Sequence, residues 1–232
     1  RGLDSRSVQR LLCGNWEYQD DPMALMAYDR IVDVFSNTGV ASGERFITAD
    51  IARFGDDSTV ICLWNGLRCE KIVVRARQGV DATARDISAL ASAAGVPLSH
   101  IVCDEDGVGG GVADLLKCKG FCNNASPVDV RGKKQNFTNL KSQCYFLLAD
   151  AVGRGQVYVA VDDPQLRSRI IEELEQVRAV DVSGEGRLAV VPKARVKEVL
   201  GRSPDVADAL MMRMYFVLHP PGATKDLARF FG

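Results

Sequence analysis

The residues best suited to chemistry are aspartates at the ends of predicted strands and at the start of a predicted helix. Asp50 follows the apolar run FITA, and Asp104 follows the apolar run IVC. Asp205 and Asp208 stand three apart in SPDVADALMMRMYFVL, so a helix there places both on one side. Carboxylate oxygens are the ligands that Mg²⁺ prefers. If the fold brings these acids together, they predict a metal site for phosphodiester hydrolysis.

This chemistry needs acids and no histidine. In two-metal hydrolysis, ions about 3.5–4 Å apart activate water, hold the scissile phosphate and stabilise the leaving oxygen. We therefore expect Mg²⁺ or Mn²⁺ as the cofactor, with two ions in the site. His100 and His219 are the only histidines, and without partner ligands we expect both to be structural or exposed.

Each acid taken alone has a simpler interpretation. Asp50 can end a strand in a turn, Asp56 and Asp57 in GDDS suit a hairpin turn, and acids in the first turn of a helix complement its dipole. One of the two GDDS acids can still support the site. The combination of remote acids, rather than any single one, predicts the metal site.

The glycine-rich stretch GVGGG at 107–111 invites a nucleotide-binding interpretation, because a glycine loop before a helix can cradle phosphate on backbone N–H groups. Here Asp104, Glu105 and Asp106 precede the first glycine and would repel a bare pyrophosphate. No GxxxxGK[ST] motif occurs, and RGKK at 131–134 lacks the upstream glycine and the hydroxyl. A metal ion would instead use the acids and let the glycines bring backbone close to a phosphate.

The elements that position these acids follow a recognisable order. The expected strands are 45–52, 58–64, 69–76, 99–104, 127–131 and 158–161, with a late hairpin at 177–192. The expected helices are 3–12, 22–36, 80–95, 109–120, 138–155, 164–177 and 203–218. The order predicts an α/β fold with an RNase H-like mixed sheet, in which three antiparallel strands precede alternating helices and parallel strands. Helices flank the sheet, and the late β-hairpin is an addition.

The site can form only if the strands that end at Asp50 and Asp104 lie side by side and parallel. Ligand sites in open α/β sheets commonly lie outside such strand ends. The fold therefore makes a geometric demand that a structure can check.

Composition is that of a globular protein. The 232 residues are 47% hydrophobic and 25% charged, with 29 Lys and Arg against 30 Asp and Glu for a net charge of −1. No apolar run reaches the roughly 20 residues that span a bilayer, so we expect no membrane. The seven cysteines are odd in number and mostly within apolar runs, which indicates reduced thiols in a cytosol.

Basic residues gather in two stretches that can bind DNA phosphates, contacts that position DNA without reading its sequence. The predicted DNA-binding residues are Arg131, Lys133, Lys134, Lys193, Lys197 and Arg202. Lys141 lies close to the first stretch. The alternative is an ordinary solvated face.

At these residues the sequence resembles the C-terminal nuclease domain of large terminase subunits, the DNA-packaging motors of tailed bacteriophages. The similar segments are TADIARFGDDSTV, IVCDEDGVGGGVADLL and KARVKEVLGRSPDVADALMMR, and RLLCGNWEY resembles the segment that joins the family's ATPase to its nuclease. Nearly the whole chain is covered. Many members have two adjacent acids where this chain has Pro204-Asp205, so the third ligand can be Asp205 or Asp208.

The resemblance implies a metal-dependent endonuclease that cleaves concatemeric double-stranded viral DNA during genome packaging. Asp50, Asp104 and Asp205 match the catalytic positions, and Asp208 matches a supporting acid. We expect all four to bind metal, with Asp50 bridging both ions, Asp104 and Asp205 each holding one, and Asp208 supporting them.

The resemblance also implies an organisation. Residues 1–44 would be a helical linker from a missing N-terminal ATPase, 45–218 the RNase H-like nuclease domain, and 219–232 a flexible tail. The sequence begins at Arg1 rather than Met, as expected of a piece of a longer protein. The implied partners are double-stranded DNA, the ATPase domain, the small terminase subunit and the portal protein. The implied location is the host cytoplasm, transiently at the viral procapsid.

Three other functions are compatible with the same residues. A Holliday-junction resolvase- or transposase-like nuclease would share the fold and prefer branched or end-specific DNA. A sugar-kinase or actin-like ATPase domain would bind ATP without cutting DNA. A non-catalytic DNA-binding or docking module of the packaging motor would bind its partner even after loss of the acids.

Overall fold

The computed structural model describes residues 23–52, 57–76, 78–106, 109–182 and 186–222. The predicted helix at 3–12, the segment RLLCGNWEY, Asp56 and most of the tail lie outside these residues. The described part is an α/β fold with a six-stranded mixed sheet between helices and a separate two-stranded hairpin. The predicted architecture is therefore confirmed.

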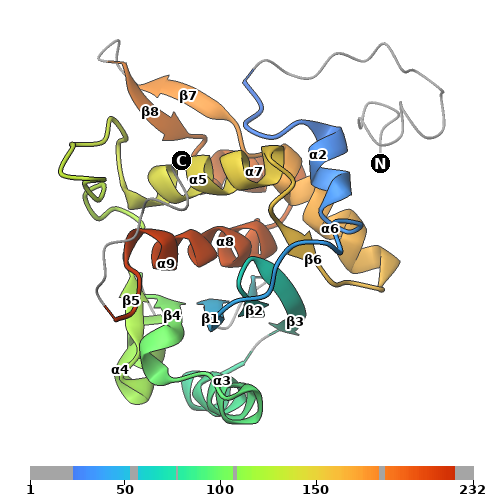
Figure 1. Cartoon of the computed structure of the whole chain (residues 1–232), viewed down its shortest axis with the longest axis vertical. Coiled ribbons are helices and arrows are strands. Elements are labelled where there is room, and N and C mark those ends of the chain that lie inside the picture. The colour runs from blue at the N-terminus through green and yellow to red at the C-terminus, as the bar shows by residue number, and fades with distance from the viewer. Residues whose placement is uncertain (1–22, 53–56, 77, 107–108, 183–185, 223–232) are drawn as a thin grey trace.

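The main sheet has the spatial order β5-β4-β1-β2-β3-β6 (Figure 1). Its strands are β1 (Arg45–Asp50), β2 (Ser58–Asn65), β3 (Arg68–Ala76), β4 (Ile101–Asp104), β5 (Lys119–Phe121) and β6 (Tyr158–Val159). The first three are antiparallel, whereas β4, β5 and β6 each pair in parallel with a neighbour. The hairpin of β7 (Ala179–Val182) and β8 (Arg187–Val190) stands apart as the predicted late addition.

Side chains of β1 alternate between two cores, as successive residues of a strand must. Ile47 and Ala49 belong to the core beneath one face of the sheet. Phe46 belongs to the larger core on the other face, and Thr48 on that face donates from Oγ1 to the carbonyl of Ala209, 2.7 Å away. By the same alternation, Asp50 leaves the strand on the larger-core face.

Strand β4 repeats this pattern directly beside β1. The parallel register pairs Thr48 with Val102 and Ala49 with Cys103, so Asp50 and Asp104 each follow the last paired residue. Val102 belongs to the same large core as Phe46, which places Asp104 on the same face as Asp50. The demand for two adjacent, parallel strands is thus met.

Helices cover both faces of the sheet (Figure 1). The smaller core lies under α3 (Val80–Ala94) and α4 (Gly109–Leu116). The larger core contains residues of α2 (Tyr28–Asp33), α5 (Leu140–Gly153), α6 (Pro164–Glu175), α8 (Asp205–Met211) and α9 (Tyr215–Leu218). A further helix, α7 (Lys193–Leu200), follows the β7-β8 hairpin and leads to α8.

Several predicted elements differ from the structure. The predicted helix 22–36 is helical as α2 only over Tyr28–Asp33, and the predicted helix 109–120 ends at Leu116, before β5. The strand predicted at 127–131 is wrong: the strand after α4 is β5, whose three residues are too few for a periodic signal. The predicted helix 203–218 is divided by a 3-10 turn at Met212–Met214. There Arg213 turns inward, donates from Nε to the Gly66 carbonyl at 2.9 Å and stacks over Phe46.

Other expectations concern single residues. His100 stacks on Phe46 with ring centroids 5.0 Å apart, and His219 stacks on Tyr215 at 4.3 Å, so both have structural contacts. The six cysteines of the described part are free thiols. None of the helices in that part is long and apolar enough to cross a membrane.

Candidate active site

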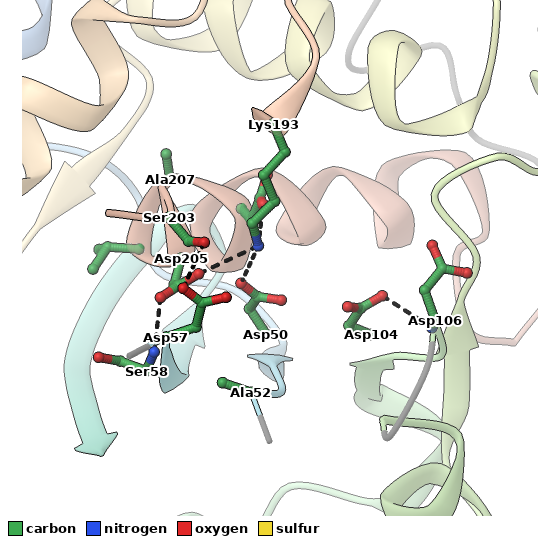
Figure 2. A network of polar contacts seen from close by, with 12 residues as sticks. Asp50, Ala52, Asp57, Ser58, Asp104, Asp106, Lys193, Ser203, Asp205 and Ala207 are labelled. Carbon is green, nitrogen blue, oxygen red and sulfur yellow. Dashed lines mark hydrogen bonds and ion pairs between the residues drawn. The ribbon is translucent and has the colours of Figure 1, made fainter. Parts of the chain in front are cut away.

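The site lies at the carboxyl ends of β1 and β4, beneath the first turn of α8 (Figure 2). Asp50 ends β1, Asp104 ends β4, and Asp205 opens α8 with Asp208 one turn later. Asp50, Asp205 and Asp208 are at most 5% exposed, whereas Asp104 is half-buried. The hydrogen bond from Thr48 to the Ala209 carbonyl holds α8 against the sheet. The fold therefore brings together acids that are up to 158 positions apart in the sequence (208 − 50).

Lys193, the first residue of α7, reaches into the middle of these acids (Figure 2). Its Nζ lies 3.1 Å from Asp208 Oδ2, 3.3 Å from Asp205 Oδ1 and 3.4 Å from Asp50 Oδ2. The sequence predicted this lysine as a DNA contact. In the structure its ammonium instead occupies the place between three carboxylates that a bound cation would take.

Asp208 is held from behind by α5. Tyr145 donates from its hydroxyl to Asp208 Oδ1 at 2.6 Å, and Lys141 Nζ lies 2.7 Å from the same oxygen. Burial acts to raise the pKa of Asp208, but the charges of Lys141 and Lys193 and these hydrogen bonds lower it to about 2. Asp208 is thus a fixed anion that presents only Oδ2 to the site.

The Lys141–Tyr145 pair was missed as part of the acid site. The signal available in the sequence is a Lys and a Tyr at i and i+4, which share one face of a helix. The sequence does not show that this face meets an aspartate 63 positions further on.

Asp205 is held by contacts from β2 and α6. The backbone N–H of Ser58 donates to Asp205 Oδ2 at 2.8 Å, and Arg169 Nη2 lies 3.6 Å from the same oxygen. Beside it, Asp57 Oδ1 accepts from Ser203 Oγ and from Lys197 Nζ, both at 2.8 Å. Burial acts to raise the pKa of Asp57, but the hydrogen bonds from Lys197 and Ser203 leave it lowered. Ser58 and its neighbour Asp57 therefore support the Asp205 end of the site, as one interpretation of the sequence allowed.

Asp104 is oriented by a small network that does not reach Lys193. Asn123, just after β5, donates from Nδ2 to Asp104 Oδ1 at 3.1 Å and to Asp106 Oδ2 at 2.7 Å. The backbone N–H of Asp106 donates to Asp104 Oδ1 at 3.2 Å. Burial, with the charge of Asp106, raises the pKa of Asp104 to about 6.

Asp50 ends β1 among the other site acids. Its burial raises its pKa well above the ordinary value, and the charges of Asp208, Asp205 and Asp104 add to the effect. Lys193 opposes the shift, but its one charge is shared with two other carboxylates, which raise the pKa of the ammonium in turn. The cluster therefore has more negative charge than Lys193 can neutralise, and additional positive charge would stabilise it.

Gly109, in the glycine-rich stretch, has a steric role that the sequence did not predict. A Cβ on Gly109 would lie 1.6 Å from the carbonyl oxygen of Asp104, so only glycine allows α4 to start this close to the end of β4. A Cβ on Gly110 would be 3.4 Å from the nearest atom, the Glu105 carbonyl oxygen. The requirement for glycine at position 109 is therefore steric, and it fixes the backbone that carries Asp104.

The carboxylate oxygens of the four acids are ligands that suit a divalent cation, but they are not arranged around one common point. Across the described residues, no three Asp, Glu, His or Cys side chains are placed to hold one metal ion. The Lys193 ammonium lies within 3.4 Å of Asp50, Asp205 and Asp208. Its side chain is 38% exposed, so it can withdraw toward solvent and leave hard oxygen donors facing one space.

The predicted DNA-binding residues fall into two groups. Lys193, Lys197 and Arg202 are paired with acids, the last through Nη2 to Glu172 Oε2 at 3.0 Å. The second group, Arg131, Lys133 and Lys134, is exposed on the loop between β5 and α5. That loop is tied to the late hairpin, because the N–H of Leu188 donates to the carbonyl of Asn136 at 2.9 Å and the N–H of Thr138 to the carbonyl of Leu188 at 3.0 Å.

Comparison with known proteins places this fold. No family model matches the sequence, and no curated protein matches it. Among solved structures, the nuclease domain of the large terminase subunit gp2 of bacterial virus Sf6 is similar, with a TM-score of 0.72 and 21% identity over 83% of this chain and 98% of that one. The large terminase nuclease from thermophilic phage G20c has a TM-score of 0.55 and 15% identity over 83% and 98%. The chain therefore has the RNase H-like fold of the nuclease domains of phage large terminase subunits, as the resemblance predicted.

Proposed function

We propose that this chain is the nuclease of a phage terminase, a metal-dependent endonuclease that cleaves concatemeric double-stranded viral DNA during packaging. The observation that carries the proposal is the convergence of Asp50, Asp205 and Asp208 around Lys193, with Asp104 at the end of the adjacent parallel strand, in the fold of terminase nucleases. Burial raises the pKa of Asp50 and of Asp104, and nearby acids add to the effect, as is common among the acids of functional sites.

The proposed cofactor is Mg²⁺ or Mn²⁺, with two ions. Similar structures support a divalent metal. The Sf6 domain is described as a lysine-to-alanine variant with manganese or with calcium, and the G20c nuclease with magnesium or cobalt. Here Asp50 would bridge the ions, Asp104 and Asp205 would hold one each, and Asp208 Oδ2 would support them. When bound, the ions would activate water and stabilise charge on the phosphate.

The chain's own residues perform the preparatory steps. Lys141 and Tyr145 keep Asp208 ionised, and Asn123 orients Asp104, so each carboxylate has a fixed direction before any ion arrives. Lys193 neutralises part of the negative charge of the cluster. On withdrawal, its ammonium remains beside the site, where it can contact a DNA phosphate.

A second candidate is a DNA-binding or docking module that does not cut. The observation that favours it is the Lys193 ammonium in the centre of the acids, which compensates them without a metal. In that case the exposed loop at 131–134 and the hairpin would bind DNA, and the acids would serve folding alone.

The wider setting is proposed on the resemblance alone. Residues 1–44 would lead from an ATPase domain, 45–218 would form the nuclease, and 219–232 would be a tail. The small terminase subunit and the portal protein would be partners in the host cytoplasm. Within the described part, Ile31 and Val34 of the first segment are buried in the larger core, so this segment packs on the nuclease domain.

A plasmid-nicking assay tests the proposal. Wild type should convert supercoiled plasmid to nicked and linear forms with Mn²⁺ and stop when the metal is chelated. Asp50→Asn should lower the rate by at least about 100-fold, because it removes the acid shared by both ions. The matched control is Asp150→Asn, an exposed acid of α5 paired with Arg154, which should cut at the wild-type rate.

Full activity in the Asp50→Asn variant would exclude this site. Binding of DNA without cutting, unchanged by the substitution, would favour the docking module. Comparing linear, supercoiled and four-way junction DNA distinguishes a resolvase, which would prefer the junction.

A further inference from the structure

The start of α8 lacks a cap of its own. Helix N-termini leave backbone N–H groups without partners in the helix. The residue before α8 is Pro204, and no side chain from the N-cap position accepts a hydrogen bond. The N–H groups of Val206 and Ala207, which lie between Asp205 and Asp208, therefore depend on an acceptor from elsewhere.

Glu173 of α6 provides that acceptor. Its Oε2 accepts from the N–H of Val206 at 2.8 Å and from the N–H of Ala207 at 2.9 Å. The residue is 0% exposed. A wholly buried carboxylate is costly unless it is hydrogen-bonded and paired with charge, so its retention here needs a reason beyond packing.

The second oxygen of Glu173 extends the network toward the site. Oε1 accepts from Arg169 Nε at 2.7 Å and lies 3.7 Å from Arg202 Nε. Arg169 also places Nη2 3.6 Å from Asp205 Oδ2. One guanidinium thus touches both the buried carboxylate that caps α8 and the first acid of that helix.

We propose that Glu173 and Arg169 are positioning residues that fix the first turn of α8, and with it the directions of Asp205 and Asp208. The proposal deepens the proposed function, because the two aspartates matter as ligands only if the site binds metal. A purely structural contact could lie anywhere along α8. Glu173 instead contacts the two N–H groups that lie between Asp205 and Asp208, and Arg169 contacts Asp205 itself.

The test compares Glu173→Gln with Glu172→Gln. Glutamine keeps the volume of Glu173 but removes the charge that pairs with Arg169, whereas Glu172 contacts Arg202 Nη2 and not the N–H groups of α8. Two readouts are measured: amide hydrogen exchange at Val206 and Ala207, and the Mn²⁺ concentration that gives half-maximal binding, followed by the paramagnetic signal of free Mn²⁺.

Glu173→Gln should raise the half-saturating Mn²⁺ concentration about 10- to 100-fold, the usual effect of losing a residue that orients metal ligands. Exchange at the two amides should rise by at least about tenfold, because a cap to an uncharged acceptor is weaker. Glu172→Gln should leave both within about twofold of wild type, because the N–H groups of Val206 and Ala207 keep Glu173 as their acceptor.

Arg169→Lys is the second variant, used if Glu173→Gln does not fold. Arg169 is 21% exposed and lysine keeps the charge, but lysine has one nitrogen in place of the two, Nε and Nη2, that contact Glu173 and Asp205. It should raise the half-saturating Mn²⁺ concentration by about threefold. Wild-type exchange and Mn²⁺ binding in folded Glu173→Gln, or in Arg169→Lys if the first variant fails, would overturn the proposal. If wild type binds no Mn²⁺, the proposed function fails, and exchange alone decides whether Glu173 fixes α8.

Discussion

The hydrogen bond from Tyr145 to Asp208 allows a quantitative test of how the site holds its acids. Tyr145→Phe removes one hydroxyl from a buried ring and changes nothing else in shape. A hydrogen bond to a charged group contributes about 1.5–3 kcal/mol. A cavity of about 20 Å³ lined by Lys141, Tyr145 and Asp208 has room for one water that can replace part of the bond. We therefore expect a loss of about 1.5 kcal/mol in the free energy of unfolding at neutral pH.

The pH dependence of this loss has a definite sign. The pKa of Asp208 is lowered to about 2 in the folded protein, below the value of about 3.9 for an unfolded aspartate. Ionised Asp208 therefore contributes stability above about pH 4 that is lost as the pH falls through about 2. Removing about 1.5 kcal/mol should raise the folded pKa by about one unit. The difference between variant and wild type should then shrink between about pH 4 and pH 2.

Urea unfolding at a series of pH values measures this difference. Tyr158→Phe is the matched control, because its ring contact is the guanidinium of Arg68, 4.6 Å from the ring centroid, and not a site acid. Its effect should not depend on pH in this range. A Tyr145→Phe difference that stays constant from neutral pH down to about pH 2 would refute the assignment of an ionised Asp208 as acceptor.

Three further predictions concern the rest of the site. Without metal, Lys193→Met should lower the free energy of unfolding by about 1–2 kcal/mol, a figure discounted for the exposure of the lysine. Added Mn²⁺ should then raise the melting temperature of this variant more than that of wild type. An equal rise would contradict competition between the ammonium and the metal. Gly109→Ala should destabilise the fold by about 1–3 kcal/mol in chemical denaturation and reduce DNA cutting. Gly110→Ala should be neutral or slightly stabilising. Similar losses of stability in the two variants would refute the steric argument. Mn²⁺ binding should release more protons at about pH 5.5 than at about pH 8, because the pKa of Asp104 is raised to about 6 and the pKa of Asp50 is also raised. Calorimetry in buffers of different ionisation enthalpy measures the number of protons released. Equal release at the two pH values would contradict the prediction.

The sequence predicted the parts of the fold that local pattern determines. Strand β1, the hairpin at Asn65-Gly66 and helix α3 follow from apolar runs, turn residues and helical spacing, and all three are present. That Asp50 and Asp104 end neighbouring parallel strands was a condition for the site, and the register of β1 and β4 meets it. Strand β5 could not be predicted, since a three-residue strand with Gly120 at its centre carries no periodic signal.

The partners of the acids could not be predicted, because they depend on tertiary packing. Lys193 has the same residue type whether it binds DNA or fills a carboxylate cluster, and only the place of α7 decides between them. Helix α7 itself was missed because it is short and mostly exposed, with Val196 as its one buried residue. Glu173 has the sequence features of an ordinary surface acid in EELE, although it is wholly buried under α8.

The central claim is that Asp50, Asp104 and the acids of α8 share divalent cations once Lys193 withdraws. Anomalous diffraction from a crystal soaked in Mn²⁺ tests it most directly. The account predicts anomalous peaks within about 2.0–2.3 Å of oxygens from Asp50, from Asp104 and from Asp205 or Asp208, with the Lys193 ammonium displaced. Lys193 still in contact with all three carboxylates at saturating Mn²⁺, and no peak among them, would contradict it.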